Sequence, residues 1–245
     1  MSILNHIRGI SDKDKATAIK TLIDQSTPDF DFFLLVILAV LMATFGLIEN
    51  NTAVVIGSML IAPVLFPVLS LSLSIVMSDF PLIGRATGTL AKALVIGVVA
   101  ALVVALLFGQ NLVTDEILIR TQPTLLSVAI AIVAGLAVAY SSARPNLSSS
   151  LVGIAVSVAL IPPIAVIGIG LAYVRIDIVS GAIAFLLVNI IGIVFASMLV
   201  FSLMNLYVKR HIAEAAATSA DKKKIDEEKR LEKVIEHDTG VKSSS

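Results

Sequence analysis

The chain contains no cysteine, and this absence excludes disulfide bonds, thiolate metal sites and cysteine nucleophiles together. Charged residues are scarce as well. They make up 15% of the 245 residues, whereas 57% of the residues are hydrophobic and the mean hydropathy is +0.98. Soluble globular domains do not reach such values. The composition therefore predicts an integral membrane protein embedded in a lipid bilayer.

Histidine is confined to the ends of the chain, at His6, His211 and His237, and no Asp or Lys lies deep within a long apolar run. Membrane proteases and metal-dependent membrane hydrolases need such groups within reach of their substrate. We therefore expect no enzymatic activity and no metal site. No cofactor and no nucleic-acid partner are expected either.

Six long apolar runs account for most of the sequence. A helix that crosses a hydrocarbon core of about 30 Å needs roughly 20 apolar residues. The runs cover approximately 31–49, 52–77, 88–109, 124–142, 148–174 and 178–206. They predict an all-α, polytopic membrane protein with about six transmembrane helices. The first 31 residues are too long and too mixed in charge for a cleaved signal peptide, so the first span is expected to act as the targeting signal.

The positive charges give the orientation. In a six-span arrangement, sixteen of the eighteen Lys and Arg residues lie on one side, and only Arg120 and Arg175 lie on the other. Cytoplasmic loops carry the excess of positive charge, so both termini are expected in the cytoplasm. If the second or fifth run were a re-entrant hairpin instead, Arg85 or Arg175 would change sides.

Two of the runs carry proline in their middle. The second run contains Pro63 and Pro67, and the fifth contains Pro162 and Pro163. Proline removes a backbone donor and breaks the helical hydrogen-bond ladder. Broken hydrophobic segments in corresponding positions of two halves are the best sequence pointer to the binding site of a transporter. We therefore expect the second and fifth spans to be broken helices.

The two proline segments match each other 100 residues apart. At this offset Leu60, Ile61, Pro63 and Leu71 fall on Leu160, Ile161, Pro163 and Leu171. Each half has three spans, an odd number, so the second half enters the membrane upside down. This arrangement predicts a 3+3 inverted repeat with halves at about 30–109 and 120–208. The alternative is that two unrelated Leu-rich and Ile-rich helices align by chance.

Polar side chains near the breaks complete a candidate site. In lipid every backbone amide and carbonyl needs a partner, so carbonyls freed by proline must face protein, water or a ligand. The residues proposed for binding a substrate or ion are Glu49, Asn50, Asn51, Ser58, Pro63, Pro67, Ser157, Pro162, Pro163 and Asn189. Backbone dipoles, hydroxyls and amides suit a small neutral solute, an anion at helix N-termini or a partly dehydrated alkali cation. The sequence does not choose among them.

Each of these polar groups also has a structural interpretation. Asn51 before Thr52 could cap the following helix, whereas Glu49 could instead bind a cation or exchange a proton in an outward vestibule. The serines could let helices pack closely or line a polar path. Asn189 could join two helices by a hydrogen bond or contact a ligand.

Charged segments flank the membrane domain. Residues 1–29 are expected to form a cytoplasmic amphipathic segment, residues 30–208 the transmembrane domain, and residues 209–245 a charged cytoplasmic helical tail with a disordered end.

Two stretches of the sequence are also typical of a known family. Residues 49–63 read ENNTAVVIGSMLIAP and residues 159–163 read ALIPP. Together they resemble the prokaryotic family of hydrophobic proteins called domain of unknown function 389, with the likeness extending over roughly 30–208. The resemblance implies a multi-pass protein of the prokaryotic inner (plasma) membrane, and it supplies no known activity.

These observations predict a homo-oligomeric transporter or channel for a small solute or ion, with the two proline-containing spans lining the path. The alternative is a membrane scaffold or sensor that does not transport and acts through its cytoplasmic tails.

Overall fold

The computed structural model describes residues 11–61, 63–110, 112–144, 149–206, 211–220, 222 and 225–226, with the side chains of 149–159 excepted. The described part is helical throughout, without strands. Its helices are α2 (Asp12–Gln25), α3 (Phe30–Ile48), α4 (Thr52–Met59), α5 (Leu65–Met77), α6 (Phe80–Phe108), α7 (Asp115–Leu118), α8 (Leu125–Ser142), α9 (Ser149–Ala172) and α10 (Ile176–Leu203). A further helix covers 211–220.

Four helices are long and apolar enough to cross a membrane, namely α3, α6, α8 and α10. Their outer faces carry exposed large apolar side chains, among them Val99 on α6, Val133 on α8 and Phe195 on α10. Such faces are favourable against lipid tails and unfavourable against water. These helices are those expected of a membrane protein.

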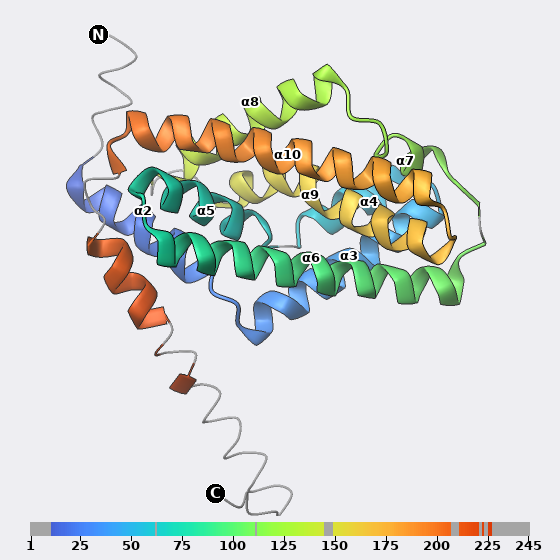
Figure 1. Cartoon of the computed structure of the whole chain (residues 1–245), viewed down its shortest axis with the longest axis horizontal. Helices are drawn as coiled ribbons and strands as arrows, with labels where there is room; N and C mark the ends of the chain where they lie inside the picture. The colour runs from blue at the N-terminus through green and yellow to red at the C-terminus, as the bar shows by residue number, and fades with distance from the viewer. Residues whose placement is uncertain are drawn as a thin grey trace, which may run out of the picture.

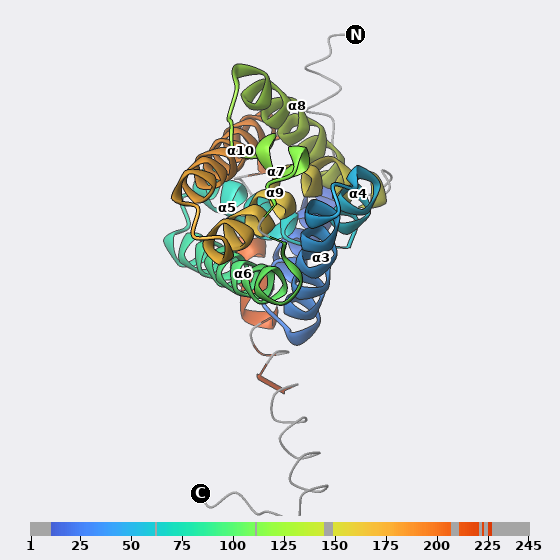
Figure 2. The same ribbon diagram turned by 90° about the vertical axis from the view of Figure 1, so that its right-hand side faces the viewer.

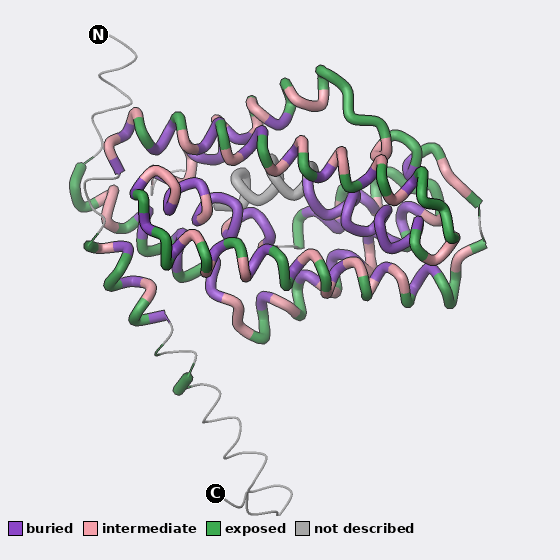
Figure 3. The backbone as a smooth tube through the Cα atoms, in the orientation of Figure 1, coloured by how far each residue is buried: buried purple, intermediate pink, exposed green. Residues whose placement is uncertain are grey.

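The other two apolar segments lie inside this set. Seen end on, α5 and α9 occupy the middle and are surrounded by α3, α6, α8 and α10 (Figure 2). All residues of α9 from Leu160 to Gly170 are buried, and the buried backbone runs through the centre of the bundle in Figure 3. The proline-containing segments therefore form the core.

The four long helices form two pairs, and the helices of one pair run in the same direction. In Figure 1, α3 and α6 run from the end that carries α2 to the end that carries α7, whereas α8 and α10 run back. We call these the α2 end and the α7 end. Between α3 and α6 the chain returns through α4 and α5, and between α8 and α10 it returns through α9. The α5–α6 turn accordingly lies at the α2 end, where α2 packs against α5.

The second apolar run is divided near its first proline. Helix α4 ends at Met59 and α5 begins at Leu65, so Pro63 lies between them. Because Pro63 has no N–H, the carbonyl of Met59 loses its i+4 donor. Pro67 lies in the first turn of α5, where a backbone N–H would have no partner within the helix.

The fifth apolar run is not divided, and here the expected break is wrong. Helix α9 continues through Pro162 and Pro163. The two missing N–H groups remove the i+4 donors of the Val158 and Ala159 carbonyls. Both prolines are buried between the surrounding helices, and this packing holds the helix together despite the lost bonds. Prolines are tolerated in this way in membrane helices.

The turns after α3, α5 and α9 have the same backbone geometry. After α3, Asn50 has φ 52° and the next N–H bonds to the Gly46 carbonyl, five residues earlier, at 2.8 Å. The other two turns are spaced regularly. Ser78, between α5 and α6, has φ 53°, and Val174, between α9 and α10, has φ 54°. In both turns the next N–H bonds to the carbonyl five residues earlier, at 3.0 and 2.9 Å. The following helices begin at Phe80 and Ile176, which are 96 residues apart. The predicted repeat offset of 100 would instead place the last residue of α5 opposite Asp177 within α10.

Candidate functional site

The first group of candidate residues lies at the α3–α4 junction, at the α7 end. Glu49 ends α3 and is exposed. Asn50 has φ 52°, a left-handed conformation that asparagine adopts more readily than most residues. The Asn51 side chain accepts hydrogen bonds from the backbone N–H groups of Ala53 and Val54, at 3.1 and 3.2 Å. Asn51 therefore acts as the N-cap of α4, as the structural interpretation of this residue predicted.

A buried acidic residue that was absent from the sequence-based set lies beside this junction. Glu116, in α7, is only 8% exposed. One carboxylate oxygen accepts from the hydroxyl of Thr52 at 2.5 Å, and the other accepts from Arg120 Nη1 at 2.6 Å. The backbone N–H of Glu116 donates to Asn50 Oδ1 at 3.1 Å. We call Asn50, Thr52, Glu116 and Arg120 the Glu116 cluster.

The Glu116 cluster fixes the connection between the α6 and α8 helices onto the start of α4. Thr114 adds a further link, because its hydroxyl donates to the Leu47 carbonyl at 2.7 Å. Burial alone would raise the pKa of Glu116, but the hydrogen bond from Thr52 and the charge and hydrogen bond of Arg120 lower it below its ordinary value. The carboxylate is thus held in its charged form.

The sequence contained only a weak signal for this cluster. Glu116 and Arg120 are four residues apart, the spacing of an ion pair on one face of a helix. The loop between the third and fourth apolar runs mixes polar and apolar residues, and its sequence does not indicate which of its charges is buried. Glu49 was predicted to bind a cation or exchange a proton in an outward vestibule, and it is exposed. Glu116, in contrast, is buried, as is Asp79 at the other end of the bundle.

Replacing Glu116 with glutamine should destabilise the protein by about 1–2 kcal/mol, between the values for exposed and buried ion pairs. The substitution leaves Arg120 half-buried without its carboxylate. The stabilisation by Glu116 is complete above the ordinary carboxyl pKa of 4.5 and is lost as the pH falls through the lowered folded value. Thermal unfolding in detergent between pH 3 and 7 measures both effects. Asp115→Asn is the matched control, because Asp115 is exposed, and an equal loss in both variants would contradict the prediction.

The second group of candidate residues lies in the interior. Ser58, Pro67, Pro162, Pro163 and Asn189 are buried, whereas Pro63 is half-buried. Asn189 is 4% exposed on α10, which packs against α5, α8 and α9. The side chain of Ser157 lies outside the described residues. The structure therefore separates the candidate residues into an interior set and a set at the α7 end.

Most of the buried hydroxyl groups that the structure describes bond to their own helices, whereas the Ser197 hydroxyl on α10 donates to the Gly135 carbonyl on α8 at 3.4 Å. The hydroxyls of Ser58, Ser72 and Ser74 donate to the carbonyls three or four residues earlier, at 2.6–2.8 Å. The hydroxyl of Thr44 does the same at 2.7 Å. Within the described part of the chain, no three His, Asp or Glu side chains are grouped for a metal ion. The interior thus offers neutral dipoles as its polar groups.

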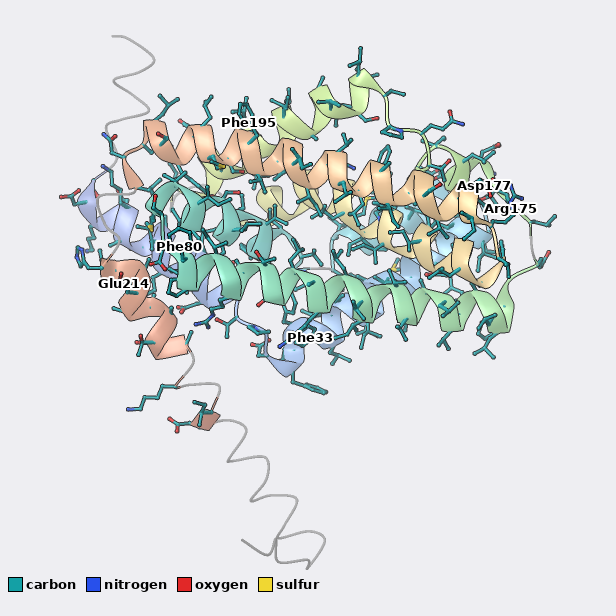
Figure 4. All side chains as sticks on the ribbon, viewed as in Figure 1. Phe33, Phe80, Arg175, Asp177, Phe195 and Glu214 are labelled. Atoms are coloured by element: carbon teal, nitrogen blue, oxygen red, sulfur yellow. The ribbon has the colours of Figure 1, made fainter. Side chains whose placement is uncertain are left out.

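The α2 end carries a separate cleft of about 440 Å³ between the start of α6 and the helix over 211–220, lined by Asp79, Pro81, Leu82, Arg85, Glu214, Ala217 and Thr218. Arg85 joins three segments here. Its guanidinium donates to the Ala217 carbonyl at 2.9 Å and to the Thr27 hydroxyl at 3.1 Å. Glu214 and Phe80 mark this end in Figure 4, opposite Arg175 and Asp177.

Comparison with known proteins gives a family and no activity. The model of the family described as "Domain of unknown function (DUF389)" matches residues 59–195. The chain is 33% identical over 171 residues to the uncharacterized protein MJ0678 of Methanocaldococcus jannaschii; the match covers 69% of this chain and 52% of that protein. The chain thus spans about half the length of this relative. No solved structure matches the chain. Because the family model covers more than half of the residues, the protein belongs to the DUF389 family.

Proposed function

We propose that this protein is a transporter or channel for a small solute or ion, with its path along α4, α5 and α9. In this proposal the chain crosses the membrane six times, with α4 and α5 together forming the second crossing. The observation that carries the proposal is the central position of the two proline-containing segments. Discontinuous or proline-containing helices at the interface of two repeats are typical of transport sites.

Two contacts between helices support two inverted halves. The middle helix of each half packs against the last helix of the other half: α5 contacts α10, and α9 contacts α6. A two-fold axis in the membrane plane would relate these two contacts to each other. The spacing of 96 residues between the turns at Ser78 and Val174 is consistent with the same relation.

The polar groups in the centre define the chemical class of the cargo. The carbonyls of Met59, Val158 and Ala159 have lost their i+4 donors to proline. With the buried hydroxyls they form a set of dipoles without net charge. These groups suit a neutral solute or a partly dehydrated monovalent ion better than a multivalent one. Because the centre is packed, transport requires α5 and α9 to separate from the surrounding helices.

The location we propose is the inner membrane of a prokaryotic cell, with both termini in the cytoplasm. The lysines and arginines support this orientation, because sixteen of the eighteen lie on the side of the termini in the six-span arrangement.

Purified protein in liposomes should conduct or carry at least one member of a panel of alkali cations, small anions and neutral solutes. Pro163→Ala restores an N–H to the Ala159 carbonyl and should lower that flux about tenfold, equivalent to 1.4 kcal/mol. The matched control is Pro81→Ala in the first turn of α6, where proline costs no hydrogen bond. The absence of flux across the whole panel, with and without a membrane potential, would contradict the proposal.

A membrane sensor or scaffold is the second candidate function. It is favoured by Arg85, which joins α6, the α2–α3 connection and the helix over 211–220 at the α2 end. Deleting residues 209–245 distinguishes the two functions. A transporter should retain flux in liposomes after the deletion, whereas a sensor should lose its output.

A further inference from the structure

Lys92 is a charged residue on the outward side of a helix that is long and apolar enough to cross the membrane. It lies in α6, at the periphery of the bundle (Figure 2), and its side chain is exposed. Val95, Val99 and Val103 follow it along the helix and are 49–63% exposed. Because residues three or four apart share one helical face, Lys92 begins the row of side chains that faces the lipid tails.

The depth of Lys92 brings its ammonium group to the lipid headgroups at the α2 end. Lys92 precedes Phe108, the last residue of α6, by sixteen residues, or about 24 Å along the helix. With Phe108 at one boundary of a hydrocarbon core about 30 Å thick, Lys92 lies about 6 Å inside the other boundary. Side chains on a helix lean toward its N-terminus, which for α6 is the α2 end. The ammonium group therefore extends toward the phosphates of the leaflet at that end.

The helix surface between Lys92 and the α2 end is open. Its outward residues there are exposed or half-buried and carry no large side chain, namely Gly84, Thr87, Gly88 and Ala91. A Cβ atom on Gly84 or Gly88 would meet nothing within 4 Å. These small residues do not themselves bind a ligand, but they leave space beside the ammonium group for a phosphate.

We propose that Lys92 binds the phosphate headgroup of an anionic phospholipid in the leaflet at the α2 end. Lys92 makes no ion pair and no side-chain hydrogen bond with any residue that the structure describes. Asp31 is exposed at the start of the adjacent α3 and is not paired with Lys92. An ammonium group at the edge of the hydrocarbon region is stabilised by an anion, and anionic lipid supplies one at this depth. The inference does not depend on transport and would hold equally for a scaffold.

Tryptophan fluorescence tests this lipid site, because the chain contains no tryptophan. Val95→Trp places a single tryptophan about one turn deeper than Lys92, beside the acyl chains of a lipid held there. The protein is reconstituted into vesicles that mix phosphatidylcholine with phosphatidylglycerol, with quenching bromine on the acyl chains of one lipid or the other. Quenching gives the ratio of the binding constants of the two lipids at this position. We expect a preference of about fivefold for phosphatidylglycerol, as for one lysine near charged headgroups.

Lys92→Gln should abolish this preference, whereas Lys92→Arg should retain it. The matched control is Val103→Trp, which lies on the same side of α6 but beside the other leaflet, and its lipid ratio should not change with Lys92→Gln. A tryptophan at position 95 that reports no preference, or a preference unaffected by Lys92→Gln, would overturn the proposal and leave Asp31 as the anion nearest to the lysine.

Inorganic phosphate separates a lipid headgroup from a free anion. The preference should be the same in phosphate and in sodium chloride of equal ionic strength, and its loss in phosphate alone would overturn a lipid site. Elution in detergent shows whether each variant folds like the parent chain. Val99→Trp, which is 52% exposed on the same side of α6, is the second reporter if Val95→Trp folds poorly.

Discussion

Replacing Gly168 with alanine is expected to destabilise the protein by about 1–3 kcal/mol, although alanine is ordinarily the better helix former. Gly168 lies on α9 where this helix crosses α6. A Cβ atom there would lie 2.5 Å from Ala101 Cβ, 2.7 Å from the Val98 carbonyl oxygen and 2.8 Å from the Leu102 nitrogen. Two of these atoms are backbone, so the clash cannot be relieved by a side-chain rotation. The two helices would have to move apart along the core.

Gly88→Ala is the matched control for Gly168→Ala. Gly88 is also helical, on α6, but a Cβ atom there would meet nothing within 4 Å. This variant should gain up to about 1 kcal/mol from helix propensity alone. Melting temperatures of the two variants in the same detergent measure the difference. Equal stability of the two variants would show that α9 does not pack on α6 as described.

The positions of the long helices could be predicted from hydrophobicity because lipid imposes a minimum length on an apolar run. Helices α3, α8 and α10 begin within two residues of the predicted runs. Helix α6 begins at Phe80 instead of near residue 88, because Asp79 accepts a hydrogen bond from the Leu82 N–H and caps the helix there. Its first turns are helical although they lie before the apolar run.

The behaviour of the prolines could be predicted only in part. Proline chemistry dictates which carbonyls lose a donor, but it does not dictate whether the helix ends. Near Pro63 the chain forms a turn, and the outward side of that turn is exposed. At Pro162 and Pro163 the helix is surrounded by neighbours and continues. The difference depends on tertiary packing, which is not local in the sequence.

The Glu116 cluster shows a second limit of sequence reasoning. Asn50 was a predicted site residue and Thr52 was expected at the start of the following helix, but their partner is more than sixty residues away. The ion pair between Glu116 and Arg120 joins residues close in sequence. The burial that makes this pair stabilising is supplied by α3 and α4, which are distant in sequence. A contact between segments so far apart in sequence can be identified only from the folded structure.

A cysteine at position 78 should be labelled from the same side of the membrane as a cysteine at position 20. The parent chain contains no cysteine, so each variant carries a single reactive thiol. Ser78 is exposed in the α5–α6 turn, at the end where α2 packs against α5. An impermeant maleimide applied to inverted vesicles should label both variants nearly completely, and applied to intact cells it should label neither.

The opposite-side control is Gln122→Cys, which follows α7 and is exposed at the other end of the bundle. It should be labelled in intact cells. In the proposed six-span arrangement α4 and α5 together return the chain across the bilayer, since α3 and α6 run in the same direction, and positions 20 and 78 then share a side. Labelling of Ser78→Cys but not of Gln122→Cys in intact cells would instead make α4 and α5 a re-entrant hairpin, because the crossing of α6 separates these two positions. That outcome would remove the second crossing, and with it the odd number of spans that inverts the second half of the chain.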